Sequence, residues 1–118
     1  MKTLLLAFFL AIPVLLFSKP LTEEEKIVKL IDYIEHLQGV VFVRNGSEYT
    51  PIEAAAHLRL KRNKAGSKIK TAREFIENLA STSSVSGKPY LIKYIKDGKT
   101  LMCSSVLKVE LDRLNKLN

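Results

Sequence analysis

The chain has 118 residues, a net charge of +7, 47% hydrophobic residues and one cysteine. This length suits one small domain. The single cysteine excludes an intramolecular disulfide framework, so an apolar core must hold the fold together.

The first eighteen residues have the layout of a secretory signal peptide. Lys2 precedes an apolar run from Leu4 to Phe17 that only Pro13 interrupts, and Ser18 offers a small residue for cleavage. The run is shorter than the ~20 apolar residues that span a bilayer, so a permanent anchor is the weaker alternative. We expect a periplasmic or secreted protein of residues 19–118, with a net charge of +6 once Lys2 is removed.

The first helix is predicted to begin at Glu23, because Thr22 and Glu25 have the spacing of a capping box. Its apolar residues recur at intervals of three and four and form a stripe for the core: Ile27, Leu30, Ile31, Ile34 and Leu37. Gly39 supplies the stop. A buried strand over 40–43 follows, and Asn45-Gly46 predicts a turn after it.

Two further capping boxes predict the next helices. Thr50 and Glu53, with proline between them, predict a helix from Pro51 to about Asn63, and Gly66 ends the segment that follows. Thr71 and Glu74 predict a third helix, whose buried residues are Ala72, Phe75, Ile76 and Leu79.

The C-terminal part of the chain predicts a loop, a hairpin and a helix. Residues 81–87 are polar and small, which is typical of a loop. Asp97-Gly98 between apolar runs 90–96 and 99–103 is a strong hairpin signal. Ser104 or Ser105 is expected to cap a last helix that buries Leu107, Leu111 and Leu114. For Cys103, at the end of a strand, a buried thiol is favoured over an intermolecular bridge.

These elements together predict a small α+β domain over residues 19–118. It should contain about four helices and a short antiparallel sheet. Because a lone two-stranded hairpin is marginal in water, we expect the early strand to join the C-terminal hairpin.

Residues from several of these elements resemble a known family. The set comprises Arg44-Asn45-Gly46, Tyr49, Ala55, His57-Leu58, Lys61, Thr71-Ala72, Phe75-Ile76, Ala80-Ser81, Ser83-Ser84, Ser86-Gly87 and Pro89-Tyr90. Over most of the mature chain, their order and spacing resemble a family of small exported bacterial proteins known as a domain of unknown function. The resemblance implies a bacterial origin and a periplasmic location, and it implies no particular activity.

The second helix carries polar residues with two interpretations. Glu53, His57 and Lys61 are spaced by four and share one face, whereas Ile52, Ala55, Ala56 and Leu60 occupy the other. A histidine between a carboxylate and an amine has the setting of a tuned general base. The simpler interpretation is an exposed face on which Glu53 partners His57.

The serine-rich loop and the Asn-Gly turn are equally ambiguous. Residues 81–87 hold five hydroxyls, including those of Ser83, Ser84 and Ser86, which suit an anion site or a nucleophile. Such serines also satisfy free backbone groups in ordinary loops. Arg44 beside Asn45-Gly46 either flanks a turn or binds a carboxylate or phosphate.

Common catalytic and metal motifs are missing from the sequence. It has no Gly-x-Ser-x-Gly elbow, no Walker loop and no paired-glycine dinucleotide motif. His36, His57 and Cys103 lie on separate predicted elements without the spacing of metal ligands. We therefore expect no metal and no cofactor.

One stretch of the chain is strongly basic. No acidic residue occurs between Glu53 and Glu74. This interval contains seven cationic residues: Arg59, Lys61, Arg62, Lys64, Lys68, Lys70 and Arg73. This basic segment favours an anionic partner in the envelope, such as a polymer, a lipid head group or an acidic protein, over nucleic acid. A merely solubilising surface is the alternative.

The sequence leaves two functions open. The favoured one is a non-catalytic module that binds an anionic partner, with candidate binding residues Arg44, Asn45, His57, Lys61, Lys64, Lys68, Lys70, Ser84, Ser86 and Tyr90. The alternative is a small hydrolase or transferase in which His57 activates Ser83, Ser84 or Ser86.

Overall fold

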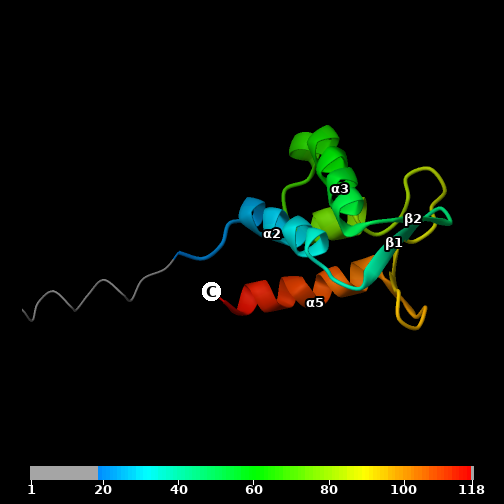
Figure 1. Ribbon diagram of the computed structural model, residues 1–118. Helices are drawn as coiled ribbons and strands as arrows, with labels where there is room; N and C mark the ends of the chain where they lie inside the picture. Colours follow the sequence, from blue (N-terminus) through cyan, green and yellow to red (C-terminus); the bar gives the residue numbers. More distant parts are fainter. Residues whose placement is uncertain (1–18, 118) are drawn as a thin grey trace, which may run out of the picture.

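The computed structural model describes residues 19–117, and the expected signal peptide lies outside them. Within this range, the helices are α2 (Glu23–Glu35), α3 (Pro51–Ala65), α4 (Ala72–Glu74) and α5 (Cys103–Lys116) (Figure 1). A 3₁₀ turn, η3 (Gly66–Lys68), follows α3, and a π-helical turn, η4 (Phe75–Leu79), continues α4. The strands are β1 (Val40–Arg44), β2 (Ser47–Tyr49), β3 (Leu91–Tyr94) and β4 (Thr100–Met102). The predicted α+β class is confirmed.

The four strands form one antiparallel sheet in the order β2-β1-β3-β4. As predicted, β1 joins the C-terminal hairpin, with Phe42 opposite Ile92 and Ile92 opposite Leu101. Asn45 and Gly46 both have positive φ, at 53° and 80°, and connect β1 to β2. Strand β2 was not predicted, because Ser47–Tyr49 is too short and too polar to signal a strand.

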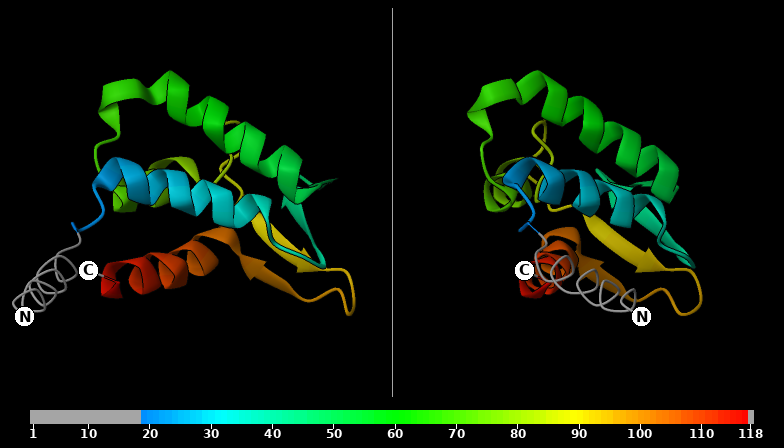
Figure 2. Two further views of the ribbon diagram at one scale, coloured as in Figure 1. Left: turned by 60° about the vertical axis from the view of Figure 1, so that its left-hand side comes forward. Right: turned by 90° about the vertical axis from the view of Figure 1, so that its left-hand side faces the viewer.

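Helix α2 lies between α3 and α5, and the sheet lies at one end of these helices (Figure 2). Four of the five residues of the predicted apolar stripe of α2 are buried, with Leu30 and Ile34 fully covered. Leu37 lies beyond the end of α2 at Glu35 and is only partly buried. Phe75 from η4 and Leu107 from α5 complete the centre of the core. The fold therefore rests on the residues whose spacing predicted burial.

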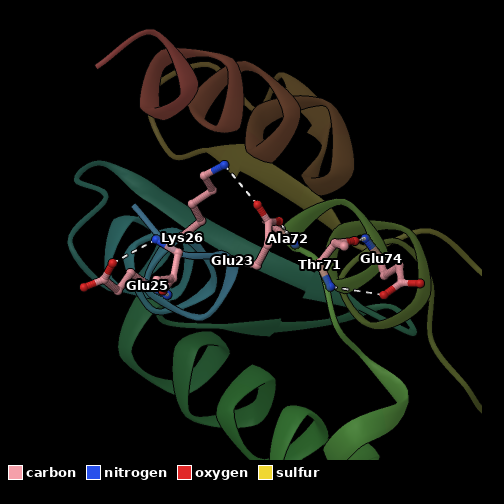
Figure 3. A network of polar contacts seen from close by, with 7 residues as sticks. Glu23, Glu25, Lys26, Thr71, Ala72 and Glu74 are labelled. Atoms are coloured by element: carbon pink, nitrogen blue, oxygen red, sulfur yellow. Dashed lines mark hydrogen bonds and ion pairs between the residues drawn. The ribbon is translucent and has the colours of Figure 1, made fainter. Parts of the chain in front are cut away.

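All three predicted capping boxes are present, at Thr22, Thr50 and Thr71. Figure 3 shows that Glu23 also links two helices: its carboxylate accepts from the Ala72 N–H at 2.8 Å and pairs with Lys26 at 3.0 Å. The hydrogen bond from Ala72 lowers the pKa of Glu23 most, and the hydrogen bond from Lys26 lowers it further. This contact fixes the first turn of α4 against α2.

Helix α3 packs differently from the expectation. Ala55 and Leu58 are its buried residues, whereas Ile52 and Leu60 are 66% and 51% exposed. His57 and Lys61 are half-buried, although they were assigned to an exposed polar face. The simpler of the two interpretations, an exposed polar face, holds for Glu53 but not for His57 and Lys61, which find polar partners on β1 and on the segment before β3.

Helix α5 begins at Cys103, so its cap lies two residues before Ser104 and three before Ser105, the predicted caps. Met102 is the N-cap residue and makes no side-chain capping bond, while Ser104 is buried inside the first turn. Leu107, Leu111 and Leu114 are buried as predicted, and so is Cys103. Of the helices in residues 19–117, none combines the length and apolar composition that a bilayer span requires.

Candidate functional site

Three segments that are far apart in the sequence bring their polar side chains together. Arg44 ends β1, and the Asn45-Gly46 turn places Tyr49 of β2 beside it. His57 and Lys61 lie one turn apart on α3, and Tyr90 directly precedes β3. We call these five residues the Tyr90 cluster.

The hydrogen bonds of the Tyr90 cluster centre on one phenol. Lys61 Nζ donates to the Tyr90 hydroxyl at 3.0 Å, and His57 Nε2 lies 3.4 Å from the same oxygen. Arg44 extends the network, because its Nη1 lies 3.2 Å from His57 Nε2 and its Nη2 donates to the Tyr49 hydroxyl at 3.2 Å. Tyr90 is only 7% exposed, so the network reaches into the protein.

The cations also contact aromatic faces. The Arg44 guanidinium lies 5.0 Å from the centre of the Tyr49 ring, and the Lys61 ammonium lies 5.0 Å from that of Tyr90. Both distances are in the range of cation–π attraction. Two tyrosines therefore hold two positive charges in place without neutralising them.

His57 is neutral at physiological pH in this setting. A guanidinium has donors only, so the contact with Arg44 requires an unprotonated Nε2 and places the ring proton on Nδ1. Burial lowers the pKa of His57, and the charges of Arg44, Lys61 and Lys64 lower it further. His57 thus presents an acceptor to Arg44, and no carboxylate among residues 19–117 forms an ion pair with it.

An apolar cavity of about 230 Å³ adjoins the cluster and lies between β1 and α3. We call it the β1–α3 cavity. Its apolar lining consists of Phe42, Val43, Ala54, Leu58 and Cys103, and its polar lining of Arg44, Tyr49, Glu53, His57 and Tyr90. Burial raises the pKa of the Cys103 thiol to about 12, so this sulfur is an uncharged part of the wall.

Glu53 is the one carboxylate in the lining of this cavity. Its Oε1 accepts from the backbone N–H of Thr50 at 2.9 Å, which completes the capping box of α3. The expected partnership between Glu53 and His57 does not occur in the described chain, since His57 bonds to Arg44 and Tyr90 instead. The site therefore combines the two cations Arg44 and Lys61 with one anion.

The predicted serine loop forms a second network beside Arg44. Buried Ser83 accepts from Asn45 Nδ2 at 3.1 Å and from the N–H groups of Val85 and Ser86. Ser86 donates to Asn45 Oδ1, whereas Ser84 is exposed. These serines satisfy backbone groups and fix the loop to the Asn45 turn, and within residues 19–117 none of them is hydrogen-bonded to His57.

The basic segment is partly neutralised in the fold. Arg59 pairs with Asp32 and Glu35, Arg62 with Glu24, and Arg73 with Glu77. Over the described residues, no carboxylate lies within ion-pairing distance of the other cations of this segment, which are Lys61, Lys64, Lys68 and Lys70. Lys64, Lys68 and Lys70 are exposed and are not part of the Tyr90 cluster.

Two features of the site were not predicted from the sequence. Tyr49 belongs to the family resemblance but was not chosen as a binding residue, because its position beside Arg44 depends on the unpredicted strand β2. The cavity itself leaves no periodic signal, since its lining comes from β1, β2, α3 and residues next to β3 and β4. Between residues 19 and 117, no three histidine, cysteine or acidic side chains are arranged to hold a metal ion.

Comparison with other proteins gives a family without an assigned activity. A relative from Salmonella typhimurium (strain LT2), the uncharacterized protein YfeK, is 41% identical over 68 residues, which is 58% of this chain and 57% of that protein. The aligned part thus spans little more than half of the relative. No solved structure matches this chain. The model of a family of unknown function, DUF5329, matches residues 21–115, and the chain therefore belongs to the DUF5329 family.

Proposed function

We propose that this chain is an exported, non-catalytic module that binds an anionic partner at the Tyr90 cluster. The proposal rests on one observation: Arg44, Lys61 and His57 meet at Tyr90, and the hydrogen bonds of the two cations go to neutral groups. Both donors are ionised, and an anionic acceptor would add the Coulomb attraction between opposite charges, which a neutral acceptor does not supply. An anion would therefore improve on the partners that Arg44 and Lys61 have now.

The surroundings of the cluster support binding over catalysis. His57 would be the general base of a hydrolase, but its Nε2 is occupied by Arg44 and Tyr90. Ser83 and Ser86 bond to Asn45 and to backbone groups of their own loop. No contact in the described part of the chain favours the hydrolase alternative.

The cellular compartment limits the classes of partner that the protein can meet. If residues 1–18 direct export, the anion belongs to the cell envelope or the periplasm, as a soluble molecule, a polymer or an acidic protein. Lys64, Lys68 and Lys70 lie in or beyond the last turns of α3 and would attract such a partner over about a Debye length. They would raise the rate of encounter, whereas the Tyr90 cluster would hold the bound group.

Thermal unfolding in different salts tests the proposal. When sodium acetate replaces sodium chloride at constant ionic strength, we expect the melting temperature of the parent to rise and to saturate, because only the folded state holds the cluster. Lys61→Met should abolish this rise, and Lys108→Met on α5 should preserve it with the same loss of charge.

Two results would contradict the proposal. One is a parent protein whose melting temperature does not respond to acetate. The other is an equal response from Lys61→Met, which would indicate a general salt effect. The triple change of Lys64, Lys68 and Lys70 to methionine should keep the saturating rise, since those lysines do not touch the cluster.

A further inference from the structure

The Tyr90 cluster and the β1–α3 cavity form one continuous surface. Arg44, Tyr49, His57 and Tyr90 belong to both, so a charged group held by the cluster has an apolar space beside it. We propose that the ligand is a small organic carboxylate, with its carboxylate on Arg44 and Lys61 and a compact apolar body in the β1–α3 cavity. This inference rests on the proposed function and specifies its ligand.

The charge of the site favours one negative group over two. Arg44 and Lys61 contribute two positive charges, and Glu53 at the cavity contributes one negative charge. A carboxylate leaves the occupied site neutral, whereas a phosphate monoester would leave it with an excess negative charge. The planar guanidinium of Arg44 also matches the two oxygens of a carboxylate.

The lining of the cavity requires an apolar body. Phe42, Ala54, Leu58 and the protonated thiol of Cys103 offer no strong hydrogen-bond partner to a sugar or a peptide group. A polar ligand placed there would lose its hydration without compensation. The apolar part of the lining therefore favours a hydrocarbon chain or ring beyond the carboxylate.

The volume limits the size of that body. An engineered apolar cavity of about 150 Å³ binds benzene, and pockets for drug-sized ligands begin at about 300 Å³. The β1–α3 cavity, at about 230 Å³, lies between these values. It suits a ring with a short linker or a short acyl chain and is too small for a long fatty acid.

A series of straight-chain carboxylates tests this inference on the parent protein. By titration calorimetry, we expect the affinity to rise at least about tenfold from acetate to hexanoate, since each buried methylene contributes up to about fourfold. The rise should level off at about eight to ten carbons, once the cavity is full. Hexanamide, which has the same body without the charge, should not bind measurably.

A matched pair of variants on α3 tests the location. Ala54 lines the cavity, whereas Ala56 is exposed on the opposite side of the helix. Ala54→Leu fills the cavity and should weaken hexanoate binding about tenfold while leaving acetate within about threefold. Ala56→Leu makes the same chemical change and should alter neither affinity.

The outcomes separate this inference from the proposed function. If acetate, inorganic phosphate and hexanoate bind equally, or phosphate binds most tightly, the anion site stands and the carboxylate inference is overturned. A steady rise in affinity to dodecanoate would indicate adsorption to the surface and would also overturn it. If no anion binds, both the inference and the proposed function fail. The affinities of the carboxylate series are measured with the parent protein, so this test does not depend on whether Ala54→Leu folds.

Discussion

Helices α2 and α3 begin in the same way and pack in opposite ways. Each starts with a threonine and glutamate capping box, and they have 13 and 15 residues. α2 buries four of its five large aliphatic residues, including Leu30 and Ile34, and none of its charged residues is fully buried. α3 exposes Ile52 and Leu60 and turns His57 and Lys61 toward the sheet and Tyr90.

This difference separates a helix whose buried residues are aliphatic from a helix that also turns polar side chains inward. The partly buried positions of His57 and Lys61 would stabilise the domain more if they were apolar, as in α2. Conflicts between local pattern and fold are expected at functional sites, where stability yields to binding. The packing of α3 is therefore itself a reason to place the function at the Tyr90 cluster.

The sharpest contrast is predicted for one substitution made in both helices. Leu30→Ala removes a side chain with no exposed surface and should lower the free energy of unfolding by about 3 kcal/mol. Leu60→Ala removes a side chain that is 51% exposed and should change it by less than about 0.5 kcal/mol. Denaturant unfolding measures both. A similar loss in the two variants would show that the exposed side of α3 is covered by another part of the protein or by a partner.

Removing the polar contact that joins α2 to α4 should lower the free energy of unfolding by a smaller amount. Glu23→Ala leaves the N–H of buried Ala72 without its acceptor and should cost about 1 kcal/mol, given that the carboxylate is partly exposed. Glu24→Ala, the neighbouring change, removes an exposed ion pair with Arg62 and should cost less.

Acid unfolding sharpens the test of Glu23. Because its pKa is lowered in the fold, Glu23 stabilises the protein above its ordinary pKa of 4.5 and loses this contribution as the pH falls through the lowered value. The difference in stability between the parent and Glu23→Ala should therefore shrink in acid. A difference that stays constant would mean that the carboxylate charge is unimportant to the link.

The inward polar side of α3 should be nearly neutral for stability. Lys61→Met retains the aliphatic stem and loses one hydrogen bond to Tyr90, so the free energy of unfolding should change by less than about 0.5 kcal/mol. The same variant should lose acetate binding. A large loss of stability would contradict the comparison of α2 with α3, because it would show that the Tyr90 cluster stabilises the fold.

The smallest expected effect on stability is the contribution of His57 to its pH dependence. The fold favours its neutral form, so the unfolded chain takes up a proton first as the pH falls below 6.5, and stability declines from there toward the lowered pKa. His57→Gln should flatten this part of the stability curve. His36→Gln, the matched change at the end of α2, retains His57 and should keep the slope. An unchanged slope in His57→Gln would contradict the burial of that ring.

The sequence predicts most of the fold because its signals are local. The capping boxes at Thr22, Thr50 and Thr71 and the hairpin signal Asp97-Gly98 each depend on a few adjacent residues. The capping boxes and the hairpin are present, but the hairpin is closed by a loop over residues 95–99 and not by the predicted two-residue turn. The orientation of α3 is not local. Spacing by four places Glu53, His57 and Lys61 on one side, but only the distant partners Arg44 and Tyr90 decide that His57 and Lys61 turn inward.

Four of the five members of the Tyr90 cluster could be proposed from the sequence, whereas Tyr49 and the arrangement of the cluster could not. Arg44, His57, Lys61 and Tyr90 were candidates, and the fold brings them together, whereas Lys68 and Lys70 lie beyond α3 and Ser84 is exposed outside the cluster. Tyr49 and the cavity depend on strand pairing, which the short polar segment Ser47–Tyr49 does not signal.

The most direct test of the central claim follows the two histidine rings of this protein by ¹⁵N NMR during an acetate titration. His57 belongs to the Tyr90 cluster on α3, and exposed His36 at the end of α2 serves as an internal reference. An anion bound by Arg44 and Lys61 replaces Nε2 of His57 as the acceptor of Arg44, so this nitrogen should shift and saturate while His36 stays unchanged. Equal, unsaturated shifts of both rings, or no shift of His57, would contradict an anion site at the Tyr90 cluster.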